Sequence, residues 1–174
     1  MPEDKKDRLA HDEAAENEAI VARTTIADVY RASKQLEGVA RKTRLIHSDY
    51  FSELSGNDVY LKPENLQHTG AFKLRGAMNK ILTLTDAERA RGFVAASSSN
   101  HGRAVAYAAQ RFGTHACIVM PRTAPPVKQT AIRALGAELV LCEASERFDV
   151  AARLCAERGA TMVPPFNDEA VMAG

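Results

Sequence analysis

The feature that most constrains the fold is a regular alternation of short apolar runs and amphipathic segments between residues 92 and 164. The runs have the length of buried strands, and the segments between them carry apolar residues at helical spacing. Strands that alternate with helices pair in parallel, through right-handed crossovers. We therefore predict an α/β fold, an open, twisted, mostly parallel sheet with flanking helices. The predicted strands are 93–96, 116–120, 138–142 and 161–163, and the predicted helices are 103–112, 126–135 and 147–157, followed by candidate C-cap glycines Gly113, Gly136 and Gly159.

Composition excludes several classes of function. Of the 174 residues 45% are hydrophobic and the formal net charge is +1, so no nucleic acid or anionic membrane is expected as a partner. No apolar run approaches the roughly 20 residues that span a bilayer, and the first residues lack the order of a signal peptide, so we expect a cytoplasmic protein with a small-molecule partner. Cys117, Cys142 and Cys155 form no CxxC pair. We expect buried thiols rather than disulfides or a zinc site.

A run of short polar side chains, from Ser97 to Gly102, follows the first predicted strand and leads into a helix. In a parallel sheet, ligands bind beyond the carboxyl ends of the strands. Free N–H groups at a helix start attract a carboxylate or a phosphate, so this loop is a candidate anion site. A polar loop that only caps its helix is an equally good interpretation. The glycine-rich motifs of dinucleotide sites and P-loops are absent from the sequence.

Lys73 is the second candidate. A turn containing Gly70 delivers it into the first turn of a helix predicted over residues 72–82. A single lysine is usually a solvated surface residue. Here the positive end of the helix dipole and the apolar neighbours disfavour the ammonium form. A free amine is what Schiff-base chemistry requires, so Lys73 is a candidate nucleophile.

Together these motifs resemble those of the pyridoxal-phosphate-dependent threonine/serine dehydratase and serine racemase family, which has the fold type II, or tryptophan synthase beta-like, architecture. The segment from Lys62 to Ala77 is similar to the family's cofactor-lysine signature, and the polar loop is similar to its Ser-x-Gly-Asn-His segment. The likeness runs from Thr25 to the last residue, through 104–109, 119–121, 135–138 and 165–168.

The resemblance implies a role for each motif residue. Lys73 would form a Schiff base with pyridoxal 5'-phosphate and, once displaced by the substrate, remove its α-proton. Phe72 would flank the cofactor ring, and Asn100 would bond to the ring's phenolic oxygen. The residues that would hold the substrate carboxylate are Ser97, Ser99, Asn100 and His101. His101 is also compatible with a purely structural loop histidine, and Ser99 replaces the glycine that the family usually has.

The activity implied is that of an ammonia-lyase, which converts L-threonine or L-serine into a 2-oxo acid and ammonia. One alternative is an amino-acid racemase, because Ser98 stands where the racemase-like branch has a serine that serves as a second base on the opposite face. A second alternative is a catalytically incomplete fragment that needs a complementary chain. The residues alone do not decide between these three.

The resemblance also implies the domain organisation. Residues 1–24 are mostly charged or small and are expected to form a flexible tail. Residues 25–91 would begin the large cofactor domain with a helix capped by Thr25, 92–164 would form a complete small α/β domain, and 165–174 would return to the truncated large domain. The family's phosphate-binding loop would then be missing and an apolar surface exposed. No metal site is expected in this chain, any divalent cation would bind through the absent C-terminal half, and the full-length form would be a homo-oligomer.

Overall fold

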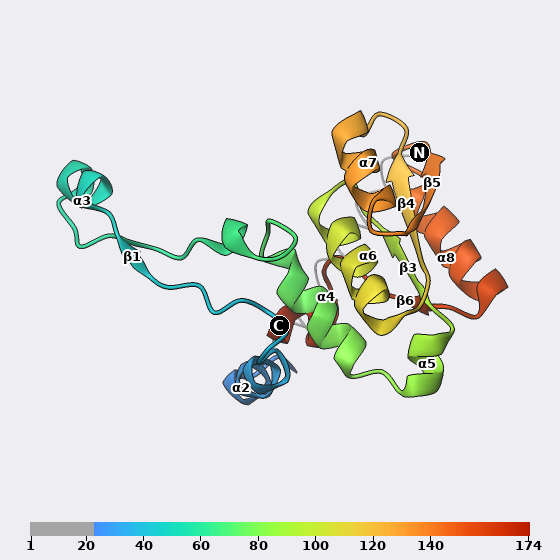
Figure 1. The fold of residues 1–174 in the computed structure, drawn as a ribbon, viewed down its shortest axis with the longest axis horizontal. Helices are drawn as coiled ribbons and strands as arrows, with labels where there is room; N and C mark the ends of the chain where they lie inside the picture. The colour runs from blue at the N-terminus through green and yellow to red at the C-terminus, as the bar shows by residue number, and fades with distance from the viewer. Residues whose placement is uncertain (1–22) are drawn as a thin grey trace, which may run out of the picture.

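The computed structural model describes residues 23–174. Figure 1 shows an α/β layer on one side, a group of helices beside it, and an extended arm on the other side. The predicted tail falls almost entirely outside the described residues. None of the helices in the described part is both long enough and apolar enough to cross a bilayer.

The α/β layer contains a four-stranded parallel sheet. Its strands are β3 (Phe93–Ala96), β4 (Ala116–Pro121), β5 (Glu138–Cys142) and β6 (Thr161–Met162), in the order β5-β4-β3-β6. Residues 93–96 pair with 116–119, residues 117–121 pair with 138–142, and residues 93–94 pair with 161–162. The predicted α/β class and its parallel pairing are confirmed. β6 lies at one edge of the sheet, beside β3.

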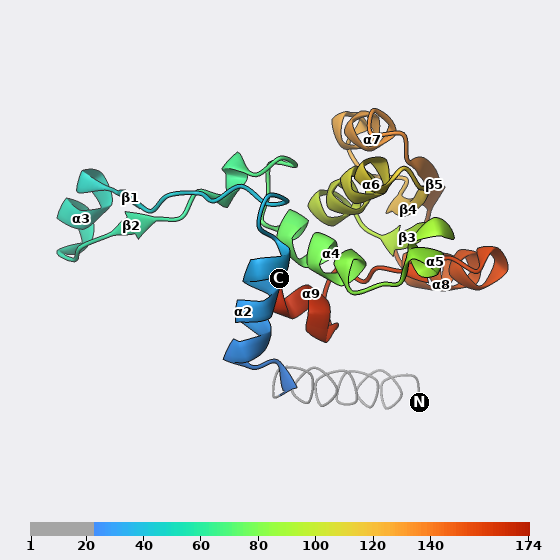
Figure 2. The same ribbon diagram turned by 60° about the horizontal axis from the view of Figure 1, so that its bottom comes forward.

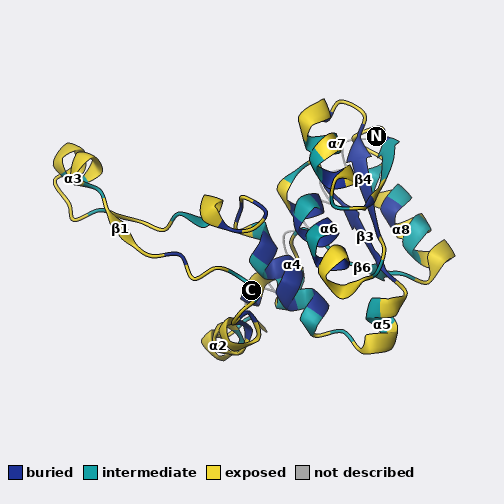
Figure 3. Cartoon of the chain, viewed as in Figure 1, coloured by how far each residue is buried: buried dark blue, intermediate teal, exposed yellow. Residues whose placement is uncertain are grey.

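Alternate residues of the central strands face opposite helices, as the pleat of a strand requires. Phe93 and Ile118 belong to the core beneath α6 (Asn100–Phe112) and α7 (Pro126–Arg133). Val94 and Cys117 belong to the core beneath α8 (Arg147–Arg158). Figure 3 shows both central strands fully buried between these helices. The continuous apolar runs of the sequence therefore reflect burial on both faces.

Two ends of the predicted helices differ from the prediction by more than one residue. Helix α6 begins at Asn100, three residues early, because the buried Ser97 hydroxyl accepts the main-chain N–H of Gly102 and supports an additional turn. Helix α7 ends at Arg133 with Ala134 as its C-cap, so Gly136 lies beyond the cap. Of the three predicted C-cap glycines, Gly113 and Gly159 do cap their helices, both with left-handed φ.

The helices beside this layer are α2 (Ile26–Gln35), α4 (Lys73–Leu82), α5 (Asp86–Ala90) and α9 (Glu169–Ala173). Figure 2 shows α9 lying between α2 and α4. Thr25 caps α2 as predicted, and it forms a capping box with Asp28. The short helices α5 and α9 were not predicted. Helix α4 packs on both α9 and α6, and so connects this group of helices to the α/β layer.

The arm consists of β1 (Ile46–His47), α3 (Asp49–Ser55) and β2 (Tyr60–Leu61), followed by the 3₁₀ turn η1 (Glu64–Leu66). β1 and β2 pair antiparallel. None of the residues in these four elements is buried, as the yellow arm of Figure 3 shows. The arm carries eight of the 17 large apolar side chains that are exposed among the described residues. Its exposed large apolar residues are Leu45, Ile46, Tyr50, Phe51, Leu54, Tyr60, Leu61 and Leu66.

All three cysteines are free thiols. Cys117 and Cys142 are buried and Cys155 is half-buried, in the core beneath α8. Burial raises the pKa of Cys117 to about 11, which keeps this thiol protonated and unreactive at neutral pH. The cysteines therefore serve as small apolar side chains.

Candidate active site

Lys73 is the first residue of α4 and therefore lies in the first turn of the helix, as the sequence predicts. The loop that precedes it is tied down by the buried side chain of Gln67, which accepts the main-chain N–H of Arg41 at 2.9 Å and donates to the Arg41 carbonyl at 2.7 Å. Gly70 then turns the chain with a φ of 73°, a conformation that strains a residue with a Cβ. A fixed loop and a glycine turn thus deliver the lysine to the helix start.

The Lys73 amine is held at the edge of a cavity. Its Nζ donates a hydrogen bond to the Pro165 carbonyl at 2.6 Å and lies 5.3 Å from the centroid of the Phe72 ring. The adjoining cavity has a volume of about 220 Å³ and is mostly apolar. It is lined by Phe72, Lys73, Gly76, Pro165, Phe166, Val171, Met172 and Gly174. Phe72 is 59% exposed, so much of its side chain is free to contact a ligand.

The polar loop divides into a buried and an exposed part. Ser97 is buried, and its Oγ accepts the N–H groups of Gly102 at 2.8 Å and Ser99 at 3.2 Å. Ser98 and Asn100 are exposed and Ser99 is half-buried, with its Oγ donating to Asn100 Oδ1 at 3.2 Å. Ser97 therefore supports the start of α6 from two residues before the N-cap Ser99, which has no side-chain capping bond of its own, while the neighbouring polar groups stay accessible at the helix start. The roles of these residues toward a substrate remain predictions.

His101 lies beneath this loop and is 3% exposed. Its Nε2 is 2.9 Å from the Val163 carbonyl, which only accepts hydrogen bonds, so Nε2 carries the proton. Burial, with a smaller contribution from the nearby charge of Lys73, lowers the pKa of His101 to about 4 against the opposing hydrogen bond. The ring is therefore neutral, and Nδ1 is a buried acceptor without a partner among the described residues. In this state His101 offers no free donor to a carboxylate, and its predicted role there stays a prediction.

Sequence reasoning missed the element that brings the two motifs together. Val163 and Pro165, just after β6, accept hydrogen bonds from His101 and Lys73 respectively. The lysine turn and the polar loop thereby meet at the carboxyl end of the parallel sheet. The one signal in the sequence was the pair Pro164-Pro165, which ends a strand because proline has no N–H for the ladder.

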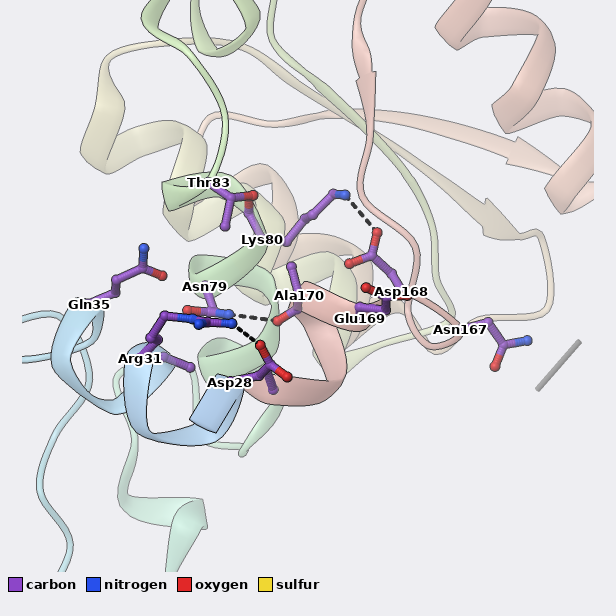
Figure 4. A pocket seen from close by; sticks show the side chains of 12 residues that line it. Asp28, Arg31, Gln35, Asn79, Lys80, Thr83, Asn167, Asp168, Glu169 and Ala170 are labelled. Atoms are coloured by element: carbon purple, nitrogen blue, oxygen red, sulfur yellow. Dashed lines mark hydrogen bonds and ion pairs between the residues drawn. The ribbon is translucent and has the colours of Figure 1, made fainter. Parts of the chain in front are cut away.

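A larger cavity, of about 550 Å³, lies between α2, α4 and α9 and contains none of the predicted site residues. Figure 4 shows that polar groups in its wall pair with one another: Lys80 with Asp168 at 2.6 Å, and Asn79 Nδ2 with the Ala170 carbonyl at 2.7 Å. Positive and negative side chains are mixed around it, without a preference for one ligand charge. We interpret this cavity as part of the packing of α9 against α4.

The residues around Lys73 fit pyridoxal phosphate. A primary amine borders an apolar cavity, an aromatic side chain stands beside the amine, and accessible polar groups lie at a helix start that favours anions. By contrast, residues 23–174 contain no group of three or more His, Cys, Asp or Glu side chains placed to hold a metal ion.

Comparisons with known proteins lead to the same cofactor as the residues around Lys73. The family model described as "Pyridoxal-phosphate dependent enzyme" matches residues 36–174. The L-threonine ammonia-lyase of Thermotoga maritima is 49% identical over 153 residues, a match covering 86% of this chain and 38% of that protein. The chain spans less than half the length of the curated relatives it matches.

Solved structures give the same result. Serine racemase from Dictyostelium discoideum superposes with a TM-score of 0.80 at 37% identity, covering 87% of this chain and 50% of that one. Maize serine racemase superposes with a TM-score of 0.82 at 32% identity, covering 86% and 46%. Because the family model matches most of the sequence and the fold agrees, the chain belongs to the pyridoxal-phosphate-dependent enzymes.

Proposed function

We propose that the protein is a pyridoxal-phosphate-dependent ammonia-lyase acting on a β-hydroxy amino acid, L-threonine or L-serine. The observation that carries the proposal is the position of Lys73 Nζ, which borders the apolar cavity and bonds to the Pro165 carbonyl, two residues from the Val163 carbonyl that accepts from His101 of the polar loop. The 49% identity to an L-threonine ammonia-lyase supports the same reaction class.

The chain's own residues supply binding and proton transfer. Lys73 would attach the cofactor through Nζ, and the same atom, when released, would accept the α-proton of the substrate. Phe72 would cover one side of the ring. The bound cofactor supplies an electron sink that makes the α-proton acidic. Loss of the β-hydroxyl and hydrolysis would then give a 2-oxo acid and ammonia.

The start of α6 would bind the substrate carboxylate. Ser98 and Asn100 are exposed there and Ser99 is half-buried, and the helix dipole favours negative charge at this end. Ser97 would act indirectly, because its Oγ already accepts two N–H groups and thereby fixes the loop. Asn100 would also bond to the cofactor's phenolic oxygen.

An amino-acid racemase is the second candidate function. The exposed hydroxyl of Ser98 and the likeness to serine racemase favour it. In that reaction Lys73 and Ser98 would exchange protons with opposite faces of the α-carbon.

A third possibility is that this chain is incomplete on its own. It spans 38% to 50% of the relatives compared above. The resemblance implies that the family's phosphate-binding loop belongs to the remainder. Cofactor binding would then need a complementary chain. A homo-oligomer, a divalent cation bound outside this chain and a cytoplasmic location remain predictions.

We also propose the division into domains that the sequence suggests. Residues 92–164 contain the whole parallel sheet, while α9 in 165–174 packs on α2 and α4, which belong to 25–91. These contacts support a small domain enclosed in sequence by two parts of a larger one.

Cofactor attachment is the first test. The purified chain is mixed with pyridoxal phosphate, reduced with borohydride and analysed by peptide mass spectrometry. We expect a visible absorbance band and modification at Lys73, and both should be lost in Lys73→Ala. Lys62→Ala is the control and should keep both, because the native Lys62 amine bonds to the Thr43 carbonyl instead. Absence of modification at Lys73 would disprove catalysis by this chain alone and favour the complementary-chain alternative.

Product analysis then separates the two reactions. Chain that binds cofactor is incubated with L-threonine or L-serine, and 2-oxo acid and D-amino acid are measured in parallel. A lyase gives mainly 2-oxo acid. If D-amino acid predominates and Ser98→Ala removes it, the racemase alternative is correct; racemisation that survives Ser98→Ala contradicts the role given to that serine.

A further inference from the structure

The main chain that follows β6 contacts both parts of the candidate site. The Val163 carbonyl accepts from His101 Nε2 at 2.9 Å, and the Pro165 carbonyl accepts from Lys73 Nζ at 2.6 Å. These partners lie 62 and 92 residues away along the chain. A short stretch of backbone thus fixes a buried ring on one side and the reactive amine on the other.

The sequence explains why these carbonyls accept from side chains. Val163 N–H makes the last bond to β3, donating to the Val94 carbonyl at 2.9 Å. Pro164 and Pro165 follow and have no N–H, so the parallel ladder ends there. Both prolines also restrict φ, which limits movement of the Pro165 carbonyl.

We propose that the Pro165 carbonyl is the resting partner of the Lys73 amine and makes Pro165 a positioning residue. Whenever Nζ is not bonded to the cofactor, this hydrogen bond holds it at the edge of the cavity, next to the Phe72 ring, and keeps the flexible side chain from extending into solvent. The hydrogen bond also restrains the amine from reacting until a ligand displaces it. The proposal deepens the proposed function and rests on Lys73 being the reactive lysine.

The carbonyl can be tested without changing any side chain. Replacing the Pro165–Phe166 amide by an ester leaves a weaker acceptor at Pro165, and Phe166 N–H donates no hydrogen bond among the described residues. Cys155 makes this practical, because a synthetic peptide of residues 155–174 can be joined to residues 1–154 by native chemical ligation. The matched control is an ester between Phe166 and Asn167, where the Phe166 carbonyl accepts no hydrogen bond in the described part of the chain.

The measurement is competitive acetylation of the cofactor-free full chain, read by mass spectrometry. Lys62 is the internal reference, because its Nζ donates to the Thr43 carbonyl, also at 2.6 Å, far from both esters in the sequence. We expect the ratio of Lys73 to Lys62 labelling to rise about two- to five-fold in the Pro165 ester, as for the weakening of one hydrogen bond. The control ester should leave the ratio unchanged.

An unchanged ratio in the Pro165 ester, or an equal rise in both esters, would overturn the proposal. If the ester chain does not fold, Pro165→Gly, which frees the main chain at this position, replaces it with the same expected rise, and an unchanged ratio again overturns the proposal. Since no cofactor is present, this result is independent of the borohydride test. A chain that fails to bind pyridoxal phosphate but shows the labelling change refutes the proposed function alone.

Discussion

At the scale of single residues, the polar loop shows how neighbours with the same side chain take different positions. Ser97 is buried and accepts two N–H groups of the α6 start, whereas Ser98 is exposed to solvent. One serine therefore stabilises the loop, and the next is available to a ligand. Substitution of Ser97 should therefore affect mainly stability, and substitution of Ser98 should affect mainly function.

We expect Ser97→Ala to lower the free energy of unfolding by about 1 kcal/mol, as for the loss of buried hydrogen bonds that support a helix start. Ser98→Ala is the matched control and should change stability by less than about 0.5 kcal/mol. Urea denaturation of the two variants and the parent chain measures both values. Equal effects would show that the Ser97 hydroxyl does not stabilise the start of α6.

His101 gives a prediction for pH. Its pKa is about 4 in the folded chain and near 6.5 when unfolded, so below pH 6.5 only the unfolded state takes up the proton. This residue therefore destabilises the fold progressively as pH falls from 6.5 toward 4, by an amount on the order of 3 kcal/mol in total. Above pH 6.5 its effect disappears.

The expected loss is measured by urea denaturation between pH 7 and pH 5, where few carboxylates titrate. His101→Gln should show a smaller loss over this range, since glutamine does not ionise. A histidine NMR signal of His101 that titrates near 6.5 in the folded chain would contradict the prediction.

At the scale of elements, the close contact of α4 with α9 supports the lysine helix. A Cβ on Gly76 would lie 2.5 Å from the Val171 carbonyl oxygen, and one on Gly174 would lie 2.7 Å from the Arg75 carbonyl oxygen. Asp168 accepts the N–H of Val171 as the cap of α9 and also pairs with Lys80. Helix α9 is thus held by contacts that tolerate no additional atoms.

We expect Gly76→Ala to destabilise the chain by about 1–3 kcal/mol, because the new methyl group meets main-chain atoms that cannot move alone. Hydrogen exchange at the N–H of Met172, which bonds to the Asp168 carbonyl, should become faster. Thr83→Ala, at the exposed C-cap of the same helix, is the control and should leave that exchange unchanged. If exchange at the Met172 N–H is unaltered in Gly76→Ala, α9 can move away from the new methyl group without losing its hydrogen bonds.

At the scale of the whole molecule, the chain combines a well-buried α/β layer with an arm that buries almost nothing. The core side chains Phe93, Ile81 and Ile118 are 0–1% exposed, whereas Tyr50 and Leu54 on the arm are 70% and 71% exposed. Exposed apolar patches of this kind promote association or mark a missing partner. The arm extends away from the rest of the chain in Figure 1, and only the other part has a core of its own.

We therefore expect the chain to bind an apolar dye and to associate as its concentration rises. Tyr50→Ser with Leu54→Ser should reduce both effects while changing stability by less than about 0.5 kcal/mol, since exposed side chains contribute little. Ile81→Ser, in the core, should instead lower stability by several times that amount. Sedimentation velocity and dye fluorescence provide the measurements, and a large loss of stability in the arm variant would show that these side chains are packed.

Much of the fold was predictable because its signals are local. Strand burial on both faces produces continuous apolar runs, and two of the four sheet strands, β3 and β5, have the predicted bounds. Helical spacing placed Lys73 in the first turn of α4, and Thr25 marked the start of α2. The short helices α5 and α9 were missed because five residues hold too little of a period to recognise.

The sequence by itself determined the parallel α/β class, the lysine at a helix start and the polar loop after a strand, since each depends on residues close together in the chain. Only the tertiary structure decided which groups meet. The partners of Lys73 and His101 are main-chain carbonyls at Pro165 and Val163. Every residue has such a carbonyl, so no side-chain pattern identifies the two that accept. Folding selects them by bringing the end of β6 beside α4 and α6.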